Sequence, residues 1–144
     1  MINCNDKPKL RTFVTFKNFN IISPHMTKPL SFIERKMISK LRLGILPLHI
    51  ETGRFSRPIL PESQRFCYCG SQEIESEAHL LFQCSRYDNL RQVWLNSLHI
   101  PENFNDLSQQ EKFDLVLNRP ENIKQTAKFV VSAMDLRSLM NKEY

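Results

Sequence analysis

Residues 67–84 read CYCGSQEIESEAHLLFQC, and this stretch organises the rest of the chain. It places Cys67, Cys69, His79 and Cys84 in the spacing C-x-C-x9-H-x4-C. Three thiolates and one imidazole are the ligand set of a closed, tetrahedral structural zinc site. Gly70 supports this interpretation, because the chain must turn sharply after a metal-binding cysteine pair and glycine tolerates positive φ. We therefore predict that these four side chains, a CCHC zinc knuckle, bind one Zn²⁺.

Two other interpretations of the cysteines remain open. They can be buried thiols, since free cysteine is among the most buried residue types. They can also form a disulfide, but three clustered cysteines leave one unpaired, and Cys67 and Cys69 are too close for an easy mutual bridge. The start of the chain, MINCNDKPKLRTF, lacks the apolar segment of a secretory signal. We therefore expect a reducing, intracellular compartment, nucleus or cytoplasm, where thiolates are favoured over disulfides.

The residues before Cys84 predict how the ligands meet. Ser76 can cap a short helix from which His79 projects, and residues 80–82, Leu-Leu-Phe, give that helix an apolar surface. Cys84 follows His79 by about one and a half helical turns. The chain can bend back there toward the same metal.

The sequence on both sides of the cysteines resembles a known family. The segments KLRLGILPLHIETGRFSRP (40–58) and CYCGSQEIESEAHLLFQCSRYDNLR (67–91) are similar to the C-terminal zinc-binding region of non-LTR (LINE-type) retrotransposon reverse transcriptases. The shared features are LRLG at 41–44, Gly-Arg-Phe at 53–55, the cysteine pair with His79, and the C-x-x-Y-x-x-x-R pattern that begins at Cys84. The resemblance implies a part in nucleic-acid binding.

We expect no enzymatic activity. The chain contains no acidic pair of the kind that binds catalytic metals in a polymerase, and Ala78 stands where the family has an acidic residue before its histidine. A closed four-ligand zinc site leaves no open position for water or substrate. His25, His49 and His99 have no evident carboxylate or nucleophile partner in the sequence.

The positive charge of the chain lies mostly before the cysteines. The net charge is +5, and residues 1–66 hold twelve Lys or Arg against four Asp or Glu, whereas residues 67–144 hold eight against eleven. A basic surface of this kind suits phosphate contacts, although lysine and arginine can equally solvate a helix face. We predict that RNA or DNA contacts Arg35, Lys36, Lys40, Arg42, Arg54, Arg57 and Arg65. An acidic patch of Glu73, Glu75 and Glu77 should keep phosphates away from the rest of the knuckle.

The alternative function is a zinc-stabilised structural or protein-interaction segment with no nucleic-acid role. No stretch of about eighteen apolar residues is present, so no membrane span is expected.

The remaining patterns predict a mainly α fold of five or six helices with the zinc knuckle embedded in it. Ser31-x-x-Glu34 is a capping box, and Gly44 is suited to end the same helix. The segments expected are 1–30 (a helix or strand over 8–19, then a loop containing Pro24), 31–100 (basic helix and knuckle) and 101–144 (helical). The buried faces expected are Ile33, Met37 and Leu41; Leu90, Val93 and Trp94; Phe113, Val116 and Leu117 after the Ser108–Glu111 capping box; and Ile123, Ala127, Val130 and Met134 in a last helix from Pro120. Phe55 is expected in the core.

Overall fold

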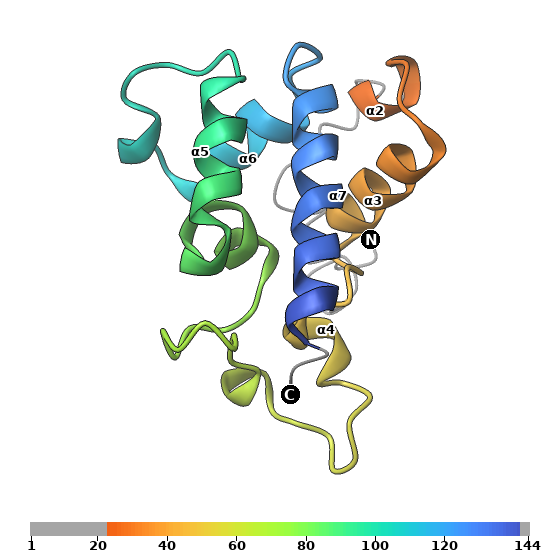
Figure 1. Ribbon diagram of the computed structural model, residues 1–144, viewed down its shortest axis with the longest axis vertical. Coiled ribbons are helices and arrows are strands. Elements are labelled where there is room, and N and C mark those ends of the chain that lie inside the picture. Colours follow the sequence, from red (N-terminus) through yellow and green to blue (C-terminus); the bar gives the residue numbers. More distant parts are fainter. Residues whose placement is uncertain (1–22, 142–144) are drawn as a thin grey trace, which may run out of the picture.

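The computed structural model describes residues 23–141, so the helix or strand expected over residues 8–19 lies outside the described residues. The described part is mainly α-helical and embeds the Cys/His cluster, which confirms the predicted fold class. Short 3-10 turns and one π-helical turn, His79–Gln83, lie between the helices. In chain order the helices are α2 (Pro24–Thr27), α3 (Phe32–Leu43), α4 (His49–Thr52), α5 (Asp88–Asn96), α6 (Gln109–Leu117) and α7 (Ile123–Met140) (Figure 1).

The last helix, α7, is the centre of the fold. It lies between α3 and α5 in Figure 1 and packs against α2, α3, α5 and α6. Its predicted stripe of Ile123, Ala127, Val130 and Met134 is buried, as the spacing of three or four residues requires. The helix begins at Ile123 and not at Pro120, because residues 119–122 form a turn in which the N–H of residue 122 donates to the carbonyl of residue 119.

Both predicted capping boxes are present. Ser31 Oγ accepts a hydrogen bond from the Glu34 N–H at 3.2 Å, and the Glu34 carboxylate accepts one from the Ser31 N–H at 2.8 Å. Ser108 and Glu111 make the same pair of bonds at the start of α6, at 3.3 and 2.8 Å. Gly44 ends α3 in the left-handed conformation, with φ of 68°. The capping boxes and the glycine therefore predicted the start of α3, the start of α6 and the end of α3 correctly.

Several predicted faces and loops were wrong. In α3 the fully buried apolar residues are Ile38 and Leu41, and Ile33 is exposed, because the side of α3 that meets α7 is turned relative to the predicted stripe. Val93 is exposed because α5 turns its Trp94 side toward α7. Pro24 begins α2 instead of lying in a loop, since the fixed φ of proline suits the first position of a helix.

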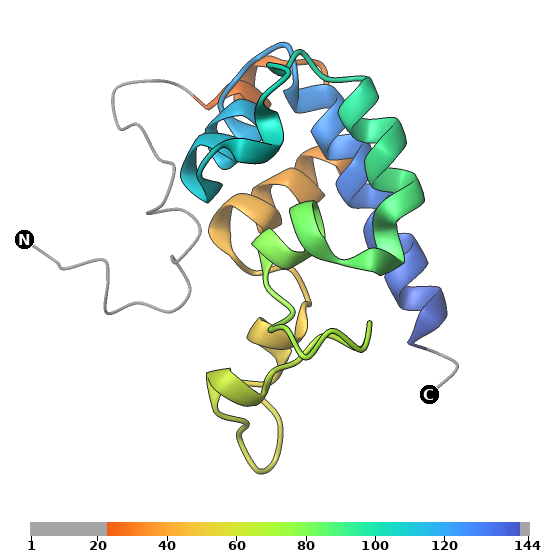
Figure 2. The same cartoon turned by 90° about the vertical axis from the view of Figure 1, so that its left-hand side faces the viewer.

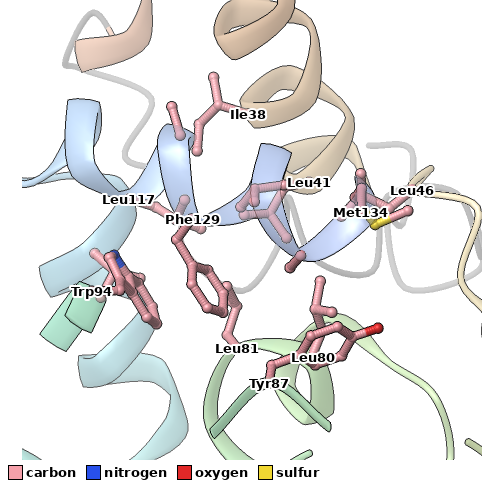
Figure 3. Close-up of a cluster of buried hydrophobic side chains, with 14 of the residues drawn as sticks. Ile38, Leu41, Leu46, Leu80, Leu81, Tyr87, Trp94, Leu117, Phe129 and Met134 are labelled. Carbon is pink, nitrogen blue, oxygen red and sulfur yellow. The ribbon is translucent and has the colours of Figure 1, made fainter. Parts of the chain in front are cut away.

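One hydrophobic core joins the segments 31–100 and 101–144. Trp94 of α5 and Phe129 of α7 stack in it with ring centroids 4.3 Å apart (Figure 3). Leu80, Leu81 and Tyr87, from the chain around the predicted zinc ligands, reach the same core (Figure 3). The knuckle region is therefore docked on the helical core and is not a separate unit.

Residues 53–66 project from this core. Figures 1 and 2 both show the segment as an extended loop beyond α4, at the lower end of the molecule. Phe55 lies in it with 68% of its surface exposed, so its predicted place in the core was wrong: the loop carries it away from the helices.

Among the described residues, no helix combines the length and apolar character that a membrane crossing needs.

Candidate metal centre

A short hairpin positions the first two cysteines. Phe66 and Ile74 form an antiparallel bridge, and the Cys67 N–H donates to the Glu73 carbonyl at 2.7 Å. Gly70 lies in the turn of this hairpin with φ of 84°, as predicted. A Cβ at this position would meet no atom within 4 Å, so backbone conformation and not space selects glycine here.

A π-helical turn positions the other two ligands. Ser76 Oγ accepts a hydrogen bond from the His79 N–H at 3.2 Å, which confirms the predicted cap. The Cys84 N–H donates to the His79 carbonyl at 2.8 Å, five residues back, and closes the turn. In a regular α-helix two residues five apart point about 140° away from each other. The wider π turn reduces this angle, so the side chains of His79 and Cys84 can point toward the same place. Single π turns are frequent at functional sites.

The hairpin and the π turn bring the four predicted ligands together. One ligand atom from each of Cys67, Cys69, His79 and Cys84 can be chosen so that all four lie within 4.8 Å of one another. Cys67 Sγ and Cys84 Sγ are 3.7 Å apart, and Cys69 Sγ is 3.4 Å from His79 Nε2.

These separations fit a tetrahedral zinc site. With Zn–S of about 2.3 Å and Zn–N of about 2.0–2.1 Å, tetrahedral angles place two sulfurs about 3.8 Å apart and a sulfur and a nitrogen about 3.6 Å apart. Nε2 is the His79 nitrogen that faces the cysteines. Nδ1 is buried without a hydrogen-bond partner in the described part of the chain. The cluster can therefore hold a metal ion through three sulfurs and Nε2.

Backbone N–H groups favour the thiolate form of all three cysteines. The backbone N–H groups of Cys69, Ser71 and Arg86, each two residues after a cysteine of the cluster, act to lower the pKa of Cys67, Cys69 and Cys84 against the opposing effect of burial. Each of these bonds lowers the pKa of the sulfur that accepts it, because it stabilises the thiolate over the thiol. A metal site needs thiolates, so the backbone around the cluster favours the ligand form of its cysteines.

Without a metal the four groups perturb one another. The contact with Cys84, together with burial, raises the pKa of Cys67 to about 12, and the same contact lowers the pKa of Cys84. Hydrogen bonding to Cys67 and then to Cys69 raises the pKa of His79 to about 9, against the opposing effect of burial. Metal binding must displace protons from these groups and will weaken as pH falls.

A buried arginine holds the peptide around the cluster. Arg91 of α5 donates to the carbonyls of Leu80, Leu81 and Cys84, at 3.2, 2.8 and 2.7 Å. Helix ends leave carbonyls without intrahelical partners, and a buried carbonyl must find a donor. Arg91 therefore satisfies the end of the π turn. It is the arginine that closes the C-x-x-Y-x-x-x-R pattern.

A buried ion pair ties the hairpin to α7. Glu75 accepts from Arg137 Nε at 2.7 Å and Nη2 at 2.8 Å, and from the His49 N–H at 2.5 Å. Glu77 is also buried. The predicted acidic patch was therefore wrong, since only Glu73 of its three members is exposed and Glu75 points toward the helical core. Arg137, which the sequence analysis did not single out, supplies the charge that makes this burial possible.

Three of the predicted phosphate contacts donate hydrogen bonds within the fold. Arg42 is buried and donates to the Leu117 carbonyl at 2.6 Å. Arg65 is buried and donates to the Ile50 carbonyl at 2.7 Å and twice to a carbonyl of the projecting loop. Arg35 is half-buried and donates to two carbonyls of α2 and the residue after it. The placement of Arg42 and Arg65 on a basic surface was therefore wrong, because the five donors of a guanidinium satisfy carbonyls that would otherwise be buried unpaired.

The other four predicted contacts reach solvent. Lys36 and Arg57 are exposed, and Lys40 and Arg54 are half-buried. Arg54 pairs with Glu51 at 3.1 Å. The structure thus brings the metal ligands together as predicted, but it leaves only part of the predicted basic set available to a phosphate backbone.

Comparison with family models, curated proteins and solved structures gives no match for this chain.

Proposed function

We propose that the chain is a non-catalytic nucleic-acid-binding module whose fold is completed by one structural Zn²⁺. The observation that carries the proposal is the convergence of three sulfurs and one imidazole nitrogen within 4.8 Å, at separations that suit tetrahedral zinc. Four protein ligands would close the site, so the metal would hold the chain in place and activate no water.

Zinc would add a direct link between the hairpin and the π turn. Cys67 and Cys69 lie on a hairpin that contains one isolated bridge, and His79 and Cys84 lie on a single π turn. Such short elements have little stability alone, since most helical and hairpin stability comes from tertiary packing. A metal bound by all four residues would connect the hairpin to the π turn directly.

The nucleic-acid role is supported by charge and by the resemblance to the retrotransposon zinc-binding region. The chain is basic, with a sequence pI of about 9.2, and Lys36, Lys40, Arg54 and Arg57 remain accessible to a phosphate backbone. The burial of Arg42 and Arg65 favours the second candidate, a zinc-stabilised structural segment without a nucleic-acid role. The two candidates differ in one measurable property, which is salt-dependent binding of RNA or DNA.

Zinc is tested first, on the purified full chain. Elemental analysis after chelator-free purification should find one zinc per chain, and the three clustered thiols should resist titration in the native state. A metal content near zero, with those thiols freely titratable, would refute the metal site.

Nucleic-acid binding is tested by charge reversal at exposed positions. The double variant Lys36→Glu/Arg57→Glu should weaken binding to any sequence to a similar degree, because phosphate contacts carry no base information. The matched control Arg119→Glu/Lys124→Glu makes the same change of charge on the exposed surface near the junction of α6 and α7. Arg42 is unsuitable for this test, since its reversal would disrupt buried hydrogen bonds. Equal effects of the two double variants, or no binding by the wild type at low salt, would favour the structural candidate.

A further inference from the structure

The projecting loop and the hairpin beside it expose several large apolar side chains. Phe55 and Ile59 of the loop are more than two-thirds exposed, and Tyr68 of the hairpin is 57% exposed. Phe66, one residue before the first zinc ligand, is also exposed. We call this region, residues 49–68 with its exposed rings, the aromatic lobe. Exposed apolar residues that occur singly need no explanation, but a group on the projecting loop and the adjoining hairpin indicates a binding surface.

Two of these rings are held from one side by a neighbouring group. His49 stacks on Tyr68 with ring centroids 5.5 Å apart and an interplanar angle of 20°. The His49 ring is itself fixed, because its Nδ1 lies 2.8 Å from the Phe66 carbonyl oxygen. The Arg54 guanidinium lies 5.7 Å from the centre of the Phe55 ring. Each ring therefore has a partner group and still leaves most of its surface to solvent.

The proposed zinc site would also fix Tyr68. This residue stands between the ligands Cys67 and Cys69, so a bound metal would pin the backbone on both of its sides. A ring whose position is set before binding loses little conformational entropy when a ligand stacks on it. Metal binding by Cys67 and Cys69 would therefore set the position of the exposed Tyr68 ring.

We propose that the aromatic lobe binds single-stranded nucleic acid by stacking unpaired bases on Tyr68 and Phe55. The proposal rests on the proposed function and names its ligand class. Aromatic rings interleaved with arginines are the usual platform for single strands, because every unpaired base offers a π face and the cation meets the phosphates. Arg57, exposed two residues after Phe55 in the sequence, is available for that second role. Arg54 instead lies over the Phe55 ring and pairs with Glu51. A duplex keeps its bases stacked on one another and offers the rings no face.

The charge of the lobe indicates which interaction should dominate. Arg54 is already paired with Glu51, and Glu62 and Glu73 are exposed on the lobe and its hairpin. The lobe is therefore not strongly basic, and stacking should contribute more of its affinity than phosphate contacts do. Consequently the preference for single strands over duplex should persist as salt rises, while total affinity falls.

The test measures fluorescence anisotropy of two probes with the zinc-loaded full chain. One probe is a labelled oligouridylate of about twenty nucleotides, and the other is a labelled mixed-sequence duplex of similar length. Stacking contributes about 1–3 kcal/mol per base, so Tyr68→Leu and Phe55→Leu should each weaken oligouridylate binding at least about fivefold and leave duplex binding unchanged. The control is Phe32→Leu, which removes a ring that is 83% exposed at the start of α3. It should change neither affinity.

Each outcome has a defined meaning. If the wild type binds both probes and the two ring variants match it on oligouridylate, the inference is wrong and the proposed function stands. If the wild type prefers duplex, the inference is also wrong. If it binds neither probe at low salt, the proposed function itself fails, and the exposed rings become candidates for a protein contact. Photo-cross-linking with a 4-thiouridine oligonucleotide supplies a second measurement, with adducts expected on Phe55 or Tyr68; adducts confined to α3 or α7 would count against the lobe.

Discussion

Replacing Arg137 with methionine tests how the hairpin that carries Cys67 and Cys69 is held on the helical core. The Glu75 side chain is 3% exposed and that of Arg137 is 11% exposed, so the pair lies almost entirely out of water. Methionine keeps much of the length of arginine and removes its charge. The Glu75 carboxylate would then keep only the His49 N–H of its three donors.

The expected cost is large because a buried charge loses its partner. Removing one member of a buried ion pair costs about 3–5 kcal/mol, which includes the loss of two charge-assisted hydrogen bonds. For a domain of this size that corresponds to a fall in Tm of more than about 10 °C. Urea unfolding in the presence of excess zinc, followed by far-UV circular dichroism, measures the change in the free energy of unfolding.

Two further variants make this result interpretable. Arg119→Met breaks the Arg119–Asp114 pair, whose side chains are 55% and 46% exposed and 3.5 Å apart, and it should cost less than about 1 kcal/mol. Glu75→Gln in the Arg137→Met background removes the unpaired charge, and it should recover part of the lost stability. If Arg137→Met costs no more than Arg119→Met, the ion pair does not hold the hairpin and the argument fails.

Three other predictions concern the metal, a helix cap and pH. Chelation, or Cys84→Ser, should increase hydrogen exchange first in residues 62–90, because structural zinc supplies on the order of 10 kcal/mol to sites that scarcely exist without it; unchanged exchange there would contradict the metal site. Ser108→Ala should destabilise the protein by about 1 kcal/mol in urea unfolding, through loss of the α6 capping box, whereas exposed Ser132→Ala in mid-α7 should have little effect. Burial, with Arg42 and Arg35 nearby, lowers the pKa of His25 from 6.5 to about 4, so protonation favours the unfolded chain. The stability that neutral His25 confers should therefore be complete above pH 6.5 and decline as pH falls toward 4, by up to about 1.4 kcal/mol per unit, and a His25→Gln chain with the same acid dependence as the wild type would refute this.

Local sequence signals determined much of the helical framework and identified the Cys/His cluster that can hold a metal ion. Capping boxes at Ser31 and Ser108 act over three residues, and the α7 stripe depends only on the helical repeat, so neither needs knowledge of distant chain. The ligand set was likewise predictable, because its donors lie within one short segment and their chemistry suits zinc. Even the cap at Ser76 followed from local pattern.

Only the tertiary structure decided what each charged or aromatic side chain does. Arg42 looked like a phosphate contact, yet its partner is the carbonyl of Leu117, 75 residues away. Glu75 looked like part of an acidic surface, yet it is buried against Arg137, 62 residues away. A guanidinium or a carboxylate can be buried only when residues far away in the sequence supply an opposite charge or an unpaired carbonyl. The free energy of burial therefore depends on a partner that local sequence does not reveal. Phe55 shows the converse, because a ring stays exposed when the fold carries its loop away from the helical core.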